Sequence, residues 1–405
     1  MVVNSKLLEV AKEFGTPLYV YDAQVVCEKF AELKGFFNYS KLKLFYAMKA
    51  NFNPAILKIL LDEGACIDAV SPAEVMLAKR VGFSNGQILF TANMLTSDEM
   101  KEVISEGVLF NIGSLSELRR YGQLNPNSDV CIRFNPDVVS GHHEKVRTGG
   151  KDTKFGILLE NIGKVKQICC EFGLRIVGVH EHTGSGIPET VDMLSGLRNI
   201  IEILTPLNFP DLKFVDFGGG FKISYHPNEI NLDYKAFGSK VVELVGQVNA
   251  CFGRELDVYF EPGRYLVAQC GVLLVEATTI KNNGGKSIVG TNSGFNQLIR
   301  PMFYDSYHHI INLSNFNDVS FVYDIAGNIC ETGDYFAQSR KVAKISEKDI
   351  LCIEDAGAYC YSMGSIYNLR AMPCEVLVDG DDVKVVSKRK SSSELALGIY
   401  SNFGD

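Results

Sequence analysis

The chain has 405 residues, more than the roughly 250–300 at which a single hydrophobic core stops growing, so at least two domains are expected. Its net charge is −8 and its basic residues form no stripe, which argues against nucleic-acid binding. No apolar run reaches the roughly 20 residues of a membrane helix and the first residues lack a signal-peptide layout, so we expect no membrane contact and a cytoplasmic location.

The eleven cysteines are scattered, with no Cys-x-x-Cys pair and no Cys/His cluster. This spacing indicates neither a disulfide framework nor a metal site. We expect most of them to be small core residues.

In chain order, the first predicted element is a strand at 16–21, which could join either of the two domains described below. Eight strand-like runs follow, each bounded by turn residues: 42–49, 66–71, 87–93, 109–114, 129–136, 175–183, 213–218 and 257–261. Helix-like stretches with apolar residues at three- and four-residue spacing lie between them, at 54–63, 72–81 with Ser71 as N-cap, 97–106, 116–121 and 161–172.

Eight such units in about 220 residues match the size of a (β/α)8 barrel, although a doubly wound open sheet would also explain the alternation. The strand ends are unusually polar, and catalytic groups of barrels gather where the strands end. These ends carry Lys49, Asp68 with Ser71, Asn93, Ser114, Arg133 with Asn135, His180 with His182 and Ser185, Asp216, and Glu261 with Arg264. The strand count and the polar ends favour the barrel, and the functional site is expected at this ring of polar strand ends.

Lys49 ends the apolar run 45–48, where a solvated charge has no structural reason to sit, although lysines also end strands at plain surfaces. A lysine held partly out of water is pushed toward its neutral amine and can form a Schiff base with a carbonyl cofactor.

Glycine-rich turns follow three of the strands. Gly218, Gly219 and Gly220 could let backbone N–H groups approach a phosphate, or could form a plain turn. The run 261–264 brings a carboxylate, a glycine amide and an arginine together, as a ligand site or as a salt-bridged surface turn. His180 and His182 share one strand face and one of them is expected to be a core histidine, whereas the Gly-Ser-Gly at 184–186 favours close approach of a ligand.

After residue 264 the pattern changes to strands separated by turns, at 265–280, 285–291, 319–325, 349–353 and 374–386. This indicates a second, β-rich domain of Greek-key or sandwich-like type. We therefore expect a barrel at 28–264, a β-rich domain at 265–405, and an N-terminal segment at 1–27 that joins the β-rich domain.

Three segments of this second domain are unusually polar. Arg300 and Tyr304 lie four residues apart, Cys330 precedes Glu331, and the run 355–359 leads to Tyr367 and Asn368. The thiol could be a buried small residue. Together the segments offer a cation, an anion and phenols, which suit an amino acid charged at both ends.

The order of these motifs resembles that of the fold-type III pyridoxal-phosphate-dependent amino-acid decarboxylases over nearly the whole chain. The shared motifs are the runs 15–21, 46–51, 182–185, 218–220, 261–264, 330–334 and 367–368. The resemblance implies pyridoxal 5'-phosphate as cofactor, with Lys49 attached to it, His182 against its ring and Glu261 at its pyridine nitrogen. The remaining residues expected around the cofactor are Asp68, Ser185, Gly218, Gly219, Gly220, Gly263, Arg264 and Tyr367.

The resemblance also implies decarboxylation, because related alanine racemases place a cation where Glu261 stands. Cys330, assisted or replaced by Lys49, would return the proton. In the family this cysteine and the next glutamate come from the partner subunit, so a homodimer with sites completed across its interface is expected.

The expected substrate is meso-2,6-diaminopimelate, converted to L-lysine and carbon dioxide in the last step of lysine biosynthesis. Arg300 and Tyr304 would bind its distal carboxylate and Glu331 its distal amine, with Arg264 and Tyr367 nearby. Arg340 is also a candidate, although 341–343 depart from the leucine-proline usual in the family. The alternatives are a decarboxylase of carboxynorspermidine, arginine or ornithine, or a cofactor-binding protein without turnover.

Overall fold

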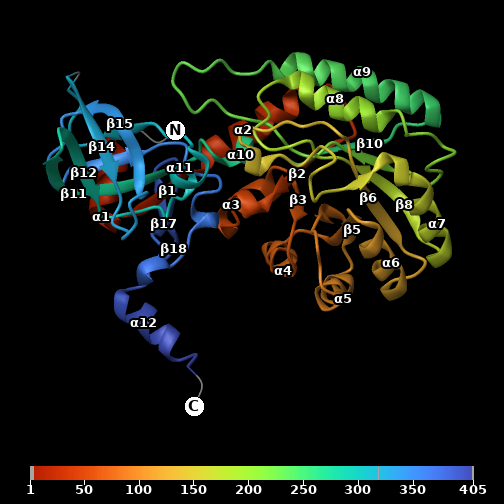
Figure 1. Ribbon diagram of the computed structural model, residues 1–405, viewed down its shortest axis with the longest axis horizontal. Coiled ribbons are helices and arrows are strands. Elements are labelled where there is room, and N and C mark those ends of the chain that lie inside the picture. Colours follow the sequence, from red (N-terminus) through yellow and green to blue (C-terminus); the bar gives the residue numbers. More distant parts are fainter. Residues whose placement is uncertain (1–3, 318, 404–405) are drawn as a thin grey trace. The chain divides into compact units, whose positions relative to one another are not determined.

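The computed structural model describes residues 4–317 and 319–403. Its contacts divide the chain into two compact units (Figure 1). We call Glu28–Ile223 with Asn231–Tyr265 the barrel unit, and Met1–Cys27, Ser224–Ile230 and Leu266–Asp405 the β unit.

The barrel unit contains a closed ring of eight parallel strands. They are β2 (Leu42–Ala47), β3 (Cys66–Ala69), β4 (Ile88–Phe90), β5 (Leu109–Ile112), β6 (Asp129–Asn135), β8 (Arg175–His180), β9 (Phe214–Asp216) and β10 (Asp257–Phe260). Each strand pairs in parallel with the next and β10 pairs with β2, so the sheet has no open edge. The prediction of a (β/α)8 barrel is confirmed, and the open-sheet alternative is wrong. The two-residue strand β7 (Ile157–Leu158) adds to β6 outside this ring.

Helices surround the barrel strands in Figure 1. They are α2 (Ala23–Gly35), α3 (Pro54–Asp62), α4 (Pro72–Val81), α5 (Ser97–Glu106), α6 (Leu115–Leu124), α7 (Ile162–Phe172), α8 (Thr190–Ile201), α9 (Tyr234–Phe252) and the short α10 (Arg264–Val267). Local signals begin them: the Ser71 side chain accepts the Glu74 N–H at the start of α4, and Thr96 and Glu99 form a capping box on α5. A layer of side chains fills the barrel, with contributions from all eight strands: Phe45, Cys66, Leu89, Leu109, Cys131, Val177, Phe214 and Tyr259.

The β unit is built on one mixed sheet, whose main path runs β15-β14-β12-β11-β1-β17-β18, with β16 pairing β11 and β13 pairing β16. Its strands are β1 (Leu18–Asp22), β11 (Gly271–Asn283), β12 (Lys286–Thr291), β13 (Ile310–Asn312), β14 (Ser320–Ala326), β15 (Tyr335–Ala343), β16 (Ile350–Ile353), β17 (Cys374–Asp379) and β18 (Asp382–Ser387). β1 lies antiparallel to β11 and parallel to β17. The N-terminal strand therefore belongs to this sheet and not to the barrel.

Three α-helices lie wholly within the described part of the β unit: α1 (Asn4–Phe14), α11 (Arg300–Tyr304) and α12 (Ser392–Tyr400), which extends beyond β18 in Figure 1. Leu7, Val10 and Ala11 of α1 bury their side chains against the apolar residues of β1, β11 and β17. The strand predicted at 265–280 starts later, because 264–267 form α10 and β11 begins at residue 271.

Seven of the eleven cysteines are buried, in agreement with the prediction that most are core residues. Within 4–317 and 319–403, none of the helices has both the length and the apolar character needed to cross a membrane.

Candidate functional site

The polar strand ends of the barrel unit meet because of strand register. Across β6, β8 and β9, Arg133 pairs with His180 and His180 pairs with Asp216. Lys49 lies in a short 3-10 turn, η1 (Met48–Ala50), directly after β2, and Glu261 directly follows β10. Parallel strands all end at one rim of a barrel. A polar residue directly after each apolar run therefore joins one shared cluster of polar side chains at that rim.

Lys49 forms an ion pair with Asp68 at the end of β3. Its Nζ lies 2.5 Å from Asp68 Oδ2, and the lysine side chain is 41% exposed while the aspartate is fully buried. Burial raises the pKa of the Asp68 carboxyl, while Lys49 acts in the opposite direction. The lysine thus presents its amine at the rim, beside a buried group that can exchange a proton with it.

Glu261 is the centre of a buried acidic cluster with His180 and Asp216. His180 Nε2 lies 3.1 Å from Glu261 Oε2, and burial lowers the pKa of His180 well below its usual value, so the ring is neutral. Burial, reinforced by Glu261, raises the pKa of Asp216, and burial also raises the pKa of Glu261. Glu261 Oε1 and Asp216 Oδ2 are buried without a hydrogen-bond partner among the described residues. In their ionised forms the two carboxylates therefore have spare acceptor capacity, while a proton held by Asp216 can be shared with Glu261.

Arg133 and Lys49 compensate this negative charge. Burial lowers the pKa of Arg133, while the surrounding carboxyl groups oppose that change: Glu261, Asp68, Glu181 and Asp216. His180, Asp216 and Glu261 are spaced closely enough to hold a metal ion, with candidate ligand atoms within 4.8 Å of one another. Lys49 and Arg133 both already lower the pKa of Glu261. Because a metal ion would add further positive charge beside them, the site favours an organic hydrogen-bond donor over a metal ion.

His182 and the glycine triplet are locked together. The Gly219 N–H donates to His182 Nδ1 at 2.9 Å, and burial lowers the pKa of His182 well below its usual value. A Cβ on Gly218, whose φ is 62°, would lie 2.5 Å from His182 Nδ1. The Gly218 N–H donates to Asp216 Oδ1. Two of the three amides expected to face an anion are thus used inside the protein, and the triplet also serves close packing.

Ser185 and Arg264 lie together at the same rim. The Arg264 Nη2 group donates to Ser185 Oγ at 3.4 Å, and Arg264 is buried at the start of α10, directly after Gly263. A hydroxyl, a guanidinium and a glycine turn suit a phosphate.

In the β unit, Arg300 is a buried cation. Its side chain is 1% exposed; Nε donates to His308 Nε2 at 3.3 Å and Nη2 to Ser306 Oγ at 3.1 Å. Among the described residues it forms no ion pair, and Nη1 has no hydrogen-bond partner. Burial raises the pKa of Asp355 to about 7, although Arg300 opposes the rise, so this carboxyl is a poor counter-ion. A buried, uncompensated guanidinium is costly unless an anion joins it.

The remaining predicted residues of the β unit form two groups. Tyr304 ends α11, four residues after Arg300, and its ring lies 4.8 Å from that of Phe303. Arg340 donates from Nη1 to the His308 carbonyl and lies over the Tyr307 ring, 4.0 Å from its centroid. Tyr304 and Arg340 therefore both lie next to the segment that holds Arg300.

Cys330, Glu331 and Tyr367 form the second group, at the surface. Tyr367 Oη donates to Glu331 Oε1 at 2.7 Å, which raises the pKa of the tyrosine. Asn368 donates from Nδ2 to Cys330 Sγ at 3.2 Å and accepts the Cys330 N–H at Oδ1. The thiol is exposed and held by a hydrogen bond.

Sequence reasoning missed two residues that organise these groups. Asp334 accepts the N–H groups of Phe295 and Ile329, both at 2.7 Å, and so shapes the turn that carries Cys330. Its place at the end of the motif 330–334 was a usable signal. His308, which contacts Arg300, gave no signal, because nothing in the local pattern separates it from His309.

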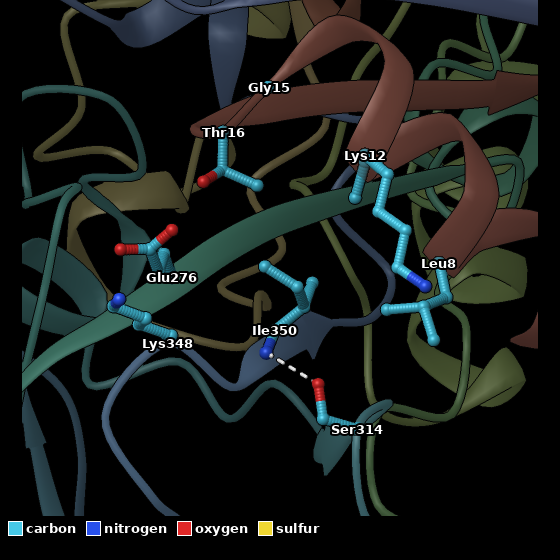
Figure 2. Close-up of a pocket in the computed structure, with 9 residues that line it drawn as sticks. Leu8, Lys12, Gly15, Thr16, Glu276, Ser314, Lys348 and Ile350 are labelled. Atoms are coloured by element: carbon cyan, nitrogen blue, oxygen red, sulfur yellow. Dashed lines mark hydrogen bonds between the residues drawn. The ribbon is translucent and has the colours of Figure 1, made fainter.

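A hollow of about 550 Å³ lies elsewhere in the β unit, lined among others by Lys12, Glu276, Ser314 and Lys348 (Figure 2). None of the predicted site residues lines it.

Comparison with known proteins gives a consistent result. Residues 23–268 match the family described as pyridoxal-dependent decarboxylase, pyridoxal binding domain. The diaminopimelate decarboxylase of Methanothermobacter thermautotrophicus is 39% identical to this chain over 406 aligned residues, which cover 98% of this chain and 95% of that protein. The diaminopimelate decarboxylase of Escherichia coli (strain K12) is 32% identical, over 96% of this chain and 95% of its own length.

Solved structures agree in fold and extent. The diaminopimelate decarboxylase from M. jannaschii, in co-complex with L-lysine, has a TM-score of 0.90 and 30% identity, and the match covers 98% of this chain and 94% of that one. The similarity thus extends over both units.

Proposed function

The chain belongs to the pyridoxal-dependent decarboxylases, and from this premise we propose that it converts meso-2,6-diaminopimelate to L-lysine and carbon dioxide. The observation that carries the choice of substrate is Arg300, a buried cation that forms no ion pair among the described residues and whose acidic neighbour, Asp355, has a pKa raised by burial to about 7. A substrate with a second carboxylate would neutralise it, whereas ornithine or arginine would leave it uncompensated. The full-length similarity to several diaminopimelate decarboxylases supports the same substrate.

The barrel residues fit pyridoxal 5'-phosphate. Among the described residues, Glu261 Oε1 is a buried acceptor without a hydrogen-bond partner, which suits the protonated nitrogen of a pyridine ring. Lys49 would hold the cofactor covalently, His182 would lie against its ring, and Ser185 with Arg264 would bind its phosphate. Once bound, the cofactor supplies an acceptor for the electron pair left when the carboxylate departs.

The protein's own groups have separate tasks around that step. Glu261 would keep the ring nitrogen protonated, because a carboxylate stabilises a proton on the group it faces. Asp68 would take up or return the proton of Lys49, its partner at 2.5 Å. Cys330, exposed and held by Asn368, would donate a proton to the carbon that has lost its carboxylate.

We infer that a second copy of the chain completes each site. Cys330 and Tyr367 are exposed, and so are four apolar residues of the same unit: Met302, which approaches Gly333, its neighbour Phe303, and Ile366 and Leu369, which are next to or near Tyr367 in sequence. Apolar side chains around polar groups are typical of a subunit interface. Glu331, paired with Tyr367, would then bind the distal amine of a substrate held by the partner.

The experiment is carbon dioxide release by the purified protein with pyridoxal phosphate, comparing meso-diaminopimelate, carboxynorspermidine, arginine and ornithine. Release from diaminopimelate alone is expected. Release from another of these substrates but not from diaminopimelate would retain the family and reject the role of Arg300. A protein that binds the cofactor but releases nothing from all four would be a cofactor carrier without turnover.

A further inference from the structure

We propose that His308 is a positioning residue, which holds the Arg300 guanidinium by accepting its Nε–H and thereby sets the affinity for the distal carboxylate of the substrate. The inference rests on the proposed function, in which Arg300 binds that carboxylate.

The hydrogen bonds of His308 determine its tautomer. Its Nδ1 lies 2.8 Å from the carbonyl oxygen of Glu354, and a carbonyl can only accept, so Nδ1 carries the proton. Nε2 lies 3.3 Å from Arg300 Nε, and an arginine nitrogen can only donate. Both contacts are satisfied together by one species, the neutral ring protonated at Nδ1.

The neutrality of this partner is important for binding an anion. A carboxylate at the same place would orient Arg300 equally well but would cancel its charge. Ser306 Oγ, which accepts from Nη2, is also uncharged. The guanidinium is thus fixed at Nε and Nη2 by neutral acceptors, keeps its positive charge, and retains Nη1 as a donor without a partner among the described residues.

His308 is itself held rigidly. It is fully buried, and its ring meets the Tyr225 ring edge-on, with centroids 5.5 Å apart. The same Tyr225 ring lies 5.1 Å from Arg300 Cζ. Arg340 donates to the His308 carbonyl, which fixes the backbone on the other side. A rigid acceptor restricts Arg300 to one orientation, which removes an entropic cost from binding the carboxylate.

The test compares two ligands that differ by one group. L-lysine carries the carboxylate assigned to Arg300, and cadaverine is the same diamine without it. We measure the dissociation constants of both from the absorbance of the cofactor in the holoenzyme. His308→Leu, which fills the space but cannot accept, should weaken L-lysine binding on the order of tenfold and leave cadaverine binding unchanged. His308→Gln, whose amide oxygen can accept, should recover part of the lost L-lysine affinity. In His308→Leu, KM for diaminopimelate should rise with little change in kcat.

A double-mutant cycle separates positioning from packing. If His308 acts through Arg300, then His308→Leu should have no further effect on L-lysine binding in an Arg300→Met background. His309→Leu is the matched control and should behave as wild type, because among the described residues the neighbouring His309 ring contacts Tyr307 Oη and makes no hydrogen bond to Arg300. Ser306→Ala is a milder variant with a smaller effect in the same direction, useful should His308→Leu fold poorly.

The outcomes distinguish the two levels of the proposal. Unchanged L-lysine binding in Arg300→Met would refute the role of Arg300 in the proposed function. A loss in Arg300→Met without a loss in His308→Leu would refute the positioning role alone. Equal weakening of both ligands by His308→Leu, or additive effects in the cycle, would mean that His308 only stabilises the fold.

Discussion

Replacing Glu261 by glutamine tests the electrostatic core of the site. The side chain keeps its size and can still accept from His180, whose Nε2 lies 3.1 Å from Glu261 Oε2, but it loses its charge. A hydrogen bond to a charged group contributes about 1.5–3 kcal/mol net. The Glu261 side chain is only 5% exposed, so solvent screens this contact little. At tenfold per 1.4 kcal/mol, kcat should fall by about 10- to 150-fold.

The assay is carbon dioxide release from diaminopimelate at saturating cofactor, with cofactor affinity measured separately by absorbance. KM should change little if Glu261 faces the cofactor, as proposed, and not the distal end of the substrate. Glu255→Gln is the control, since this glutamate is exposed and lies 4.0 Å from Lys41 on the surface. A wild-type kcat for Glu261→Gln with cofactor fully bound would refute a role of the Glu261 charge in the reaction.

Three other variants test separate parts of the reasoning. Lys49→Ala should lose borohydride-trappable cofactor and nearly all turnover; a trapped adduct at another lysine would contradict its role. Mixing Lys49→Ala with Cys330→Ala, each almost inactive, should restore about a quarter of wild-type activity, since half of randomly mixed dimers are hybrids with one intact site of two; no recovery would place both residues in one subunit's site. Burial raises the pKa of Glu181 from 4.5 to about 8, so the unfolded chain loses this proton at a lower pH than the folded protein. The free energy of unfolding therefore falls as pH rises through that range. Glu181→Gln should reduce this fall by a few kcal/mol in urea unfolding, and an identical pH slope in both proteins would contradict it.

The barrel was predictable because its signals are local. A buried parallel strand is a short apolar run, and the polar residues at its end lie at the rim, so the sequence alone assigns Lys49, Asp68 and Glu261 to one cluster. The apolar run at 265–270 was assigned to a strand because periodicity does not separate a short strand from a helical turn.

Other features depend on contacts that no local pattern reveals. β15 was missed because its alternation is broken at Ser339, which has a positive φ of 49°. The contact of His308 with Arg300 spans α11 and the turn after it, and a buried histidine is by default a packing residue. The use of the Gly219 amide within the protein follows from the position of His182, which belongs to another segment.

The position of β1 bears on how this chain is made. Residues 18–22 pair with 271–274 on one side and with 374–378 on the other, so both neighbours are synthesised after the entire barrel. On the ribosome, this apolar strand must wait unpaired while the barrel unit folds, and it enters the middle of the sheet only when the C-terminal strands emerge. Removing the first 22 residues would therefore separate β17 and β18 from the rest of the sheet instead of trimming an edge, and a nascent chain arrested before β17 would expose an aggregation-prone strand.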